Sequence, residues 1–197
     1  MTEQAVAPST PTAGKASLYL DSNSVLLAVL DNASTQDASG PLLLADQHTS
    51  SGTAINVTGV PTWVKRITVN NVGLSVSGTS YPMYRLGDSG GVETNVYQGS
   101  VAMLTAGSVS TFTVSSGFML YTIGSAGNIM HGQTIFILQS VSSNTWTCCS
   151  QLSNSAGAAV SFVSGSKALS APLDRIQLTT HSGTDTFDGG VMSVVYE

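Results

Sequence analysis

The sequence has 197 residues, a formal net charge of −5 and charged side chains at only 9% of positions, against about 25% in ordinary soluble proteins. The length suffices for one sandwich-sized domain with an extension. The six lysines and arginines are scattered, which argues against nucleic-acid binding, and no apolar run reaches the roughly 18 to 20 residues of a membrane helix. So few charges give little repulsion between copies, and we expect the chain to self-associate.

The first 45 residues have the composition of an attachment region. Met1–Ala13 is a mixture of Pro, Ser, Thr and Ala that cannot bury enough apolar area to order itself, and it lacks the basic start and apolar core of a secretory signal. Lys15–Leu30 has two apolar runs around a polar turn at Asp21–Ser24, which predicts a small β-hairpin. A lone hairpin is marginal in water, so we expect its apolar residues to anchor the chain on sister chains or on another protein: Leu18, Tyr19, Leu20, Val25, Leu26, Leu27, Val29 and Leu30.

A polar linker is predicted at Asp31–Gly40 and a domain boundary between residues 45 and 46, so that residues 46–197 form a separate domain. Short strand-like runs alternate there with Gly-rich turns, and no apolar pattern of helical period extends beyond two turns. This pattern favours an all-β fold, an antiparallel sandwich or barrel. The expected strands are Thr53–Thr58, Trp63–Val72, Tyr81–Leu86, Glu93–Tyr97, Ser110–Val114, Gly117–Ile123, Gln133–Ser140, Asn144–Cys149, Ala158–Val163, Leu173–Thr180 and Gly190–Tyr196.

Two of these segments are similar to each other. Thr53–Val72 contains the run Lys65–Asn70, and Asp174–Thr179 echoes that run near the other end of the chain. In a jelly roll the first and last strands lie side by side in one sheet. We therefore expect Arg66 and Arg175 to be near neighbours.

The two cysteines, Cys148 and Cys149, are adjacent on a predicted strand. Their side chains should point to opposite faces, and a disulfide between them would be strained. We expect both thiols to be reduced and structural, with Cys148 in the core beside Trp146.

The segment Gly87–Gly91, with Ser89 at its centre, matches the motif around the nucleophile of trypsin-like proteases. Those proteases need a histidine and then an aspartate upstream of the serine. Only His48 lies upstream, and no Asp or Glu lies between Asp46 and Asp88. A serine-first order with a downstream histidine stays open, but such a Gly-flanked polar segment is typical of a turn.

Other candidate chemistry is weaker. His181, Asp185 and Asp188 fall in one loop and could ligate a divalent cation, but their spacing matches no known cage and such residues also favour turns. We expect neither a metal nor a cofactor. A carboxylate pair for glycoside hydrolysis is not selected by any spacing among the candidates Asp88, Glu93, Asp174, Asp185 and Asp188.

Five aromatic residues could offer a platform on which sugars stack: Trp63, Tyr81, Tyr84, Tyr97 and Trp146. Their alternation with polar neighbours instead favours the core for most of them. The set Tyr81, Tyr84 and Tyr97, which lies near predicted loops, is the exception that we expect to be exposed.

The stretch Thr53–Val72, with its Gly-hydrophobe-Pro-x-Trp corner leading into Lys-Arg-Ile-Thr-Val, resembles the core signature of a widespread class of bacteriophage virion proteins. Three further segments resemble that class in the same order, Leu86–Thr94, Gly165–Ile176 and Gly183–Glu197. Thr10–Ser22 is similar to a small module common near the N-termini of phage fibre and decoration proteins. Together these segments extend over nearly the whole chain.

The resemblance implies a jelly-roll-like β-sandwich, usually homotrimeric, preceded by an attachment region and without catalytic residues. Little sequence separates the hairpin from the sandwich, so the long shaft of a tail fibre is absent. We therefore expect a capsid decoration or cement protein on the virion surface, assembled in the host cytoplasm and bound to the major capsid protein or another virion protein. The alternatives are a head or tail fibre tip that recognises a host glycan, and a polysaccharide depolymerase with two carboxylates across a cleft.

Overall fold

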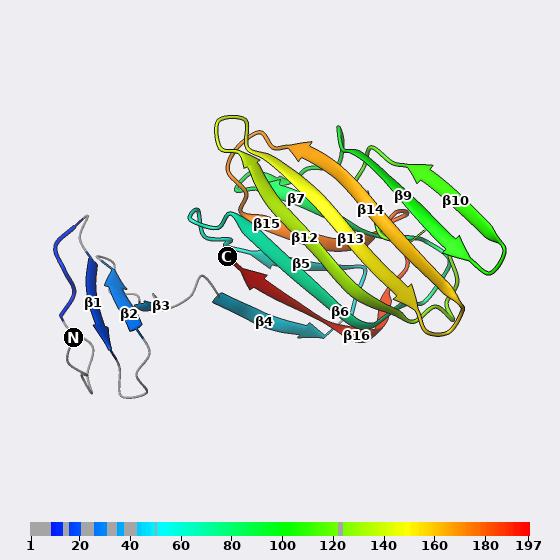
Figure 1. Cartoon of the computed structure of the whole chain (residues 1–197), viewed down its shortest axis with the longest axis horizontal. Coiled ribbons are helices and arrows are strands. Elements are labelled where there is room, and N and C mark those ends of the chain that lie inside the picture. The colour runs from blue at the N-terminus through cyan, green and yellow to red at the C-terminus, as the bar shows by residue number, and fades with distance from the viewer. Residues whose placement is uncertain are drawn as a thin grey trace. The chain divides into compact units, whose positions relative to one another are not determined.

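The computed structural model describes residues 9–13, 16–20, 26–30, 35–37, 43–49, 51–121 and 124–197. The protein is all-β, with antiparallel strand pairs (Figure 1). The chain divides into two compact units, Met1–Leu43 with Glu197 and Leu44–Tyr196. The described ranges contain no helix with the length and hydrophobicity needed to cross a membrane.

The first unit contains a three-stranded sheet in the order β1 (Ala16–Leu20), β2 (Leu26–Leu30) and β3 (Thr35–Asp37). The register of β1 and β2 runs from Ala16 opposite Leu30 to Leu20 opposite Leu26, which confirms the predicted hairpin. Strand β3 pairs with β2 inside the segment predicted to be a linker, so that prediction is wrong for Thr35–Asp37.

The second unit contains two sheets. The larger has eight strands in the order β10-β9-β14-β13-β12-β6-β16-β4, and the smaller has the order β11-β7-β15-β5, with β8 paired to β7. The larger sheet is formed by β4 (Leu43–Thr49), β6 (Arg66–Val76), β9 (Gln98–Thr105), β10 (Ser108–Thr113), β12 (Met130–Ser140), β13 (Thr145–Asn154), β14 (Ala159–Ala168) and β16 (Phe187–Tyr196). The smaller is formed by β5 (Ala54–Thr58), β7 (Pro82–Asp88), β8 (Gly91–Val92), β11 (Phe118–Met119) and β15 (Arg175–Thr180).

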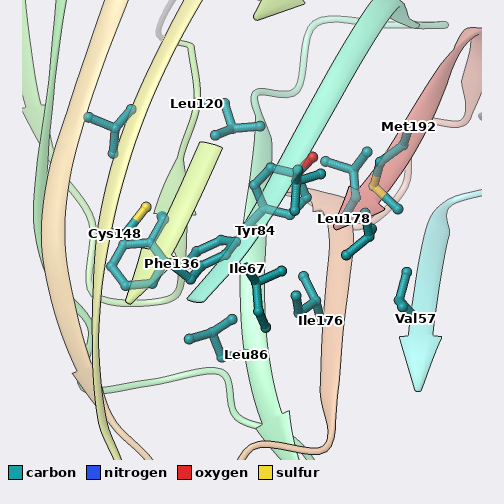
Figure 2. Packing of buried hydrophobic residues seen from close by; sticks show 14 of the residues in the cluster. Val57, Ile67, Tyr84, Leu86, Leu120, Phe136, Cys148, Ile176, Leu178 and Met192 are labelled. Carbon is teal, nitrogen blue, oxygen red and sulfur yellow. The ribbon is translucent and has the colours of Figure 1, made fainter. Parts of the chain in front are cut away.

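The core lies between the two sheets, as in a sandwich (Figure 2). Strand β13 shows the underlying pattern, because alternate residues such as Trp146 and Cys148 are buried while Cys149 is exposed. The ring of Tyr84 on β7 meets the ring of Phe136 on β12 edge to face, with centroids 5.7 Å apart. The Tyr84 hydroxyl donates to Asn71 Oδ1 at 2.9 Å, so aromatic packing and a buried hydrogen bond both join the sheets. The expectation that Cys148 lies in the core is confirmed, and Cys149 points to the opposite, exposed side as the strand alternation predicts.

The expected proximity of Arg66 and Arg175 is wrong. Arg66 begins β6 in the larger sheet, whereas Arg175 begins β15 in the smaller sheet and lies opposite Thr58 of β5. The corner after Gly59, which has a φ of 76°, carries the chain from one sheet to the other. The two halves of Thr53–Val72 therefore belong to different sheets, and only the first half pairs with the echoing strand β15.

Most expected strands are present with shifted ends, and two differences stand out. Glu93–Tyr97 is not a strand, and the strand Gln98–Thr105 that follows it was not predicted. Of the expected strand Gly117–Ile123, the structure has Phe118–Met119, and residues 122–123 lie outside the described residues. The predicted domain boundary at residues 45–46 falls inside β4 (Leu43–Thr49).

Candidate interaction surface

The protease-like segment Gly87–Gly91 is a turn, as the second interpretation of the sequence predicts. Strands β7 and β8 pair antiparallel with Asp88 opposite Gly91, which leaves Ser89 and Gly90 as the two turn residues. The Ser170 hydroxyl donates to Asp88 Oδ2 at 2.5 Å, and the Gly90 amide donates to Asp88 Oδ1 at 2.8 Å. These two hydrogen bonds hold the pKa of Asp88 below its ordinary value. Asp88 therefore braces the turn and a neighbouring loop.

Asp185, in the loop after β15, and Asp188, near the start of β16, also bind neighbouring chain segments. Asp185 Oδ2 accepts a hydrogen bond from the Ser80 amide at 2.6 Å, and Asp188 accepts one from the Ser75 hydroxyl. Across the described ranges, no three His, Cys, Asp or Glu side chains form a group that could hold a metal ion. The candidate ligand set of His181, Asp185 and Asp188 is therefore not assembled.

The expected exposed set of tyrosines is wrong. Tyr84 and Tyr97 are buried and Tyr81 is half-buried against the core. The Tyr97 hydroxyl accepts from the Leu86 amide at 2.7 Å and donates to the Glu93 carbonyl at 2.9 Å. Burial raises the pKa of both Tyr84 and Tyr97. These rings are part of the core and offer no platform for sugars.

A buried ion pair holds the loop before β9 against β14. The Lys167 ammonium is buried, pairs with the Glu93 carboxylate and lies 5.3 Å from the centroid of the Tyr97 ring. The Ser170 amide donates to Glu93 Oε1 at 2.7 Å. Although partial burial raises the pKa of Glu93, the hydrogen bonds from Lys167 and Ser170 outweigh it and hold the pKa below its ordinary value.

This pair should make stability depend on pH. Because the pKa of Glu93 is lower in the folded chain, its contribution is present above the ordinary glutamate pKa of about 4.3 and is lost as the pH falls through the folded value. Glu93→Gln should lower the free energy of unfolding at pH 7 by about 2 to 4 kcal/mol, toward the lower part of the range for buried pairs because Glu93 is partly exposed. Urea denaturation at pH 7 and pH 4 measures both effects, and the variant should lose less stability on acidification than the wild type.

The double variant Glu93→Gln/Lys167→Met is the matched control. It leaves no buried charge without a partner, so it should recover much of the stability that Glu93→Gln loses. Equal stability of Glu93→Gln and the wild type at pH 7 would contradict a stabilising role for the pair.

The larger sheet presents a face without charged side chains. Its five adjacent strands β10, β9, β14, β13 and β12 contain Lys167 as their only Lys, Arg, Asp or Glu, and the Lys167 side chain is buried. We call the solvent side of these five strands the outer face. The outer side of the smaller sheet differs, because it carries two arginines, Arg85 and Arg175. Arg85 lies opposite Gln177 in the pairing of β7 with β15.

Strand register shows how apolar and polar side chains are distributed over the outer face. At one end, Val109, Leu104 and Val160 are opposite one another across β10, β9 and β14, with Phe162 beside them. Further along, Ile135 lies opposite Cys149, which is exposed. A surface hollow of about 410 Å³ connects these regions and is lined by His131, Gly132, Gln133, Ile135, Cys149, Gln151, Leu152, Ser153 and Val160.

The composition and size of the outer face suit contact with another protein. The centres of protein interfaces are depleted of charged residues, as this face is. Five strands about 4.8 Å apart, each contributing about eight residues at roughly 3.3 Å per residue, cover on the order of 600 Å². A stable interface buries about 800 Å² on each partner, so the outer face supplies most of one such interface.

The predicted anchor residues of the hairpin belong to β1 and β2 except for Val25, which lies outside the described residues. The side chains of the other anchors are likewise outside them, so their packing stays a prediction. The outer face was missed by sequence reasoning, although a signal existed. The segment from Gln98 to Ser166 contains no Lys, Arg, Asp or Glu at all.

Comparisons of the chain with protein-family models, with curated protein sequences and with solved structures find no match.

Proposed function

We propose that the protein is a non-catalytic structural protein of a bacteriophage virion, a homotrimeric decoration or cement protein that stabilises the capsid. Residues 1–45 attach to the major capsid protein or another virion protein. Residues 46–197 form a knob that faces outward. The protein acts by adhesion. It stabilises the capsid through the free energy of its contacts, which is about 25 cal/mol per Å² of apolar area that they bury.

The observation that carries the proposal is the charge-free outer face. Three copies around a common axis bring identical side chains close together, so any charge near the axis meets two copies of itself. A face built from Ile135, Cys149, Phe162 and neutral polar side chains avoids that repulsion. The resemblance of Thr53–Val72 to phage virion proteins supplies the biological setting, and the buried state of Tyr84 and Tyr97 removes the main support for a glycan-binding tip.

Removal of the N-terminal segment tests the attachment. Because β4 begins at Leu43 and is the edge strand of the larger sheet, the deletion should comprise residues 1–42. We expect both the shortened chain and the full chain to unfold cooperatively, and we expect the shortened chain to lose binding to capsids stripped of this protein, measured by co-sedimentation. A shortened chain that still sediments with capsids would contradict attachment through this segment.

A further inference from the structure

Within the part of the chain that the structure describes, strand β10 is an unprotected edge of the larger sheet. It ends the strand order next to β9 (Figure 1), and every one of its residues is exposed. Val109 and Phe112, which point to opposite sides of the sheet, are 68% and 52% exposed. Natural edge strands are usually protected by Lys, Pro, a bulge or short length. This six-residue strand, Ser-Val-Ser-Thr-Phe-Thr, has none of these, and its pairing with β9 is regular.

The turn before β10 determines which backbone groups face the free edge. Thr105 lies opposite Ser108 across a two-residue turn, so these two residues form a hydrogen-bonded pair and the pairs alternate from there. Ser110 and Phe112 then direct their backbone N–H and C=O groups to β9. Val109, Thr111 and Thr113 direct theirs to the free edge, where they can bind an added strand.

We propose that β10 pairs antiparallel with β10 of a second copy of this chain, around a twofold axis at Thr111. A twofold axis normal to the sheet keeps like faces together, which places Thr111 opposite Thr111 and Val109 opposite Thr113 of the second copy. This register joins three hydrogen-bonded pairs. Centring the axis on Ser110 would join only two, because Ser110 directs its backbone to β9.

A second copy is the occupant that the chemistry favours. Around a twofold axis each residue near the axis meets its own copy, so a charged edge would repel itself. Strands β10 and β9 carry no charge. Pairing also places Phe112 and Val109 against neutral side chains, which removes part of their apolar surface from water, and Thr–Thr contacts across strands are favourable.

This contact is separate from the proposed trimer, because it uses the backbone edge of β10 and not the outer face. If both exist, with the twofold axes perpendicular to the threefold axis, two trimers join into closed particles of six chains. The two proposals can therefore fail independently, and the number of chains in a particle distinguishes them.

Thr111→Pro in the full chain tests the pairing. Proline removes the N–H that faces the free edge and is tolerated on edge strands, while Thr111→Val keeps the N–H and the shape of the side chain. Native mass spectrometry at equal concentrations should give half as many chains per particle for Thr111→Pro as for the wild type and Thr111→Val. An unchanged number for Thr111→Pro would overturn the proposal. A Thr111→Pro particle of one chain in place of three would count against the trimer instead.

A second variant does not depend on how well the proline is accommodated. In a chain that carries Cys149→Ser, Thr111→Cys places two thiols opposite each other across the axis, at the Cα separation of about 5.5 Å typical of such a pair and suited to a disulfide. Mild oxidation should convert this chain to a covalent dimer on a non-reducing gel. The matched control Ser182→Cys, exposed on a distant loop, should stay monomeric on the gel. Failure of Thr111→Cys to cross-link would also overturn the pairing.

Discussion

Phe136→Ala should lower the free energy of unfolding by about 3 to 5 kcal/mol, the usual cost of removing a buried aromatic ring. The Phe136 ring is fully buried and touches two others, Tyr84 at 5.7 Å and Phe118 at 5.9 Å between centroids. These three rings come from strands of both sheets (Figure 2 shows Phe136 and Tyr84). Paired strands cannot collapse freely around the cavity, so little of the loss should be recovered.

Phe162→Ala is the matched control for this prediction. It deletes the same group from the neighbouring part of the sheet, but Phe162 is 44% exposed on the outer face. We expect a loss of under about 1 kcal/mol in the folding of the single chain. Urea denaturation at two protein concentrations separates folding from assembly, because only assembly depends on dilution. Similar losses for both variants at high dilution would contradict the assignment of Phe136 to the core.

The fold class could be predicted from the sequence because alternation is a local property. Ile55 and Val57, and again Cys148 and Cys149, have the burial that a period of two implies. Strand Gln98–Thr105 was missed because its apolar residues run together at Val101–Leu104 without clear alternation.

Sheet membership could not be predicted in the same way. The likeness between Lys65–Asn70 and Asp174–Thr179 reflects similar environments, since each segment has one side in the core. Whether two such strands are neighbours depends on where the intervening corners take the chain, and the corner at Gly59 takes it across the sandwich. Tyr97 was placed near a loop correctly, but its burial depends on hydrogen bonds to Leu86 and Glu93 that only the folded chain brings within reach.

The outer face illustrates the same limit for function. Low overall charge predicted self-association, but it did not say where. The face exists because the order β10-β9-β14-β13-β12 brings strands between residues 98 and 168 side by side, and their neutral positions become one surface. The composition therefore predicts that copies associate, and the order of the strands determines that the outer face is the surface available for it.

Ile135→Glu should reduce the number of chains per particle threefold. Ile135 is half-buried near the middle of β12, the strand at one side of the outer face, and lies between Thr68 of β6 and Cys149 of β13. In a trimer that uses this face, the three carboxylates that Ile135→Glu introduces would be removed from water. They would have no oppositely charged partners and would repel one another. An unpaired buried charge costs about 3 to 5 kcal/mol, which weakens association roughly 10²- to 4 × 10³-fold. Native mass spectrometry measures the number of chains per particle. The threefold reduction is expected whether or not copies also pair through β10.

Two control variants distinguish the effect of charge on this face from other causes. Ile135→Gln keeps the size and polarity of the substitution without the charge, and it should weaken assembly far less than Ile135→Glu. Thr58→Glu adds the same charge to an exposed position of the smaller sheet and should leave the number of chains unchanged. An Ile135→Glu protein that folds and keeps the wild-type number of chains would exclude the outer face as the trimer interface. The low charge of the chain predicts self-association but not its location. Loss of assembly in Ile135→Glu but not in Thr58→Glu would place that self-association on the outer face.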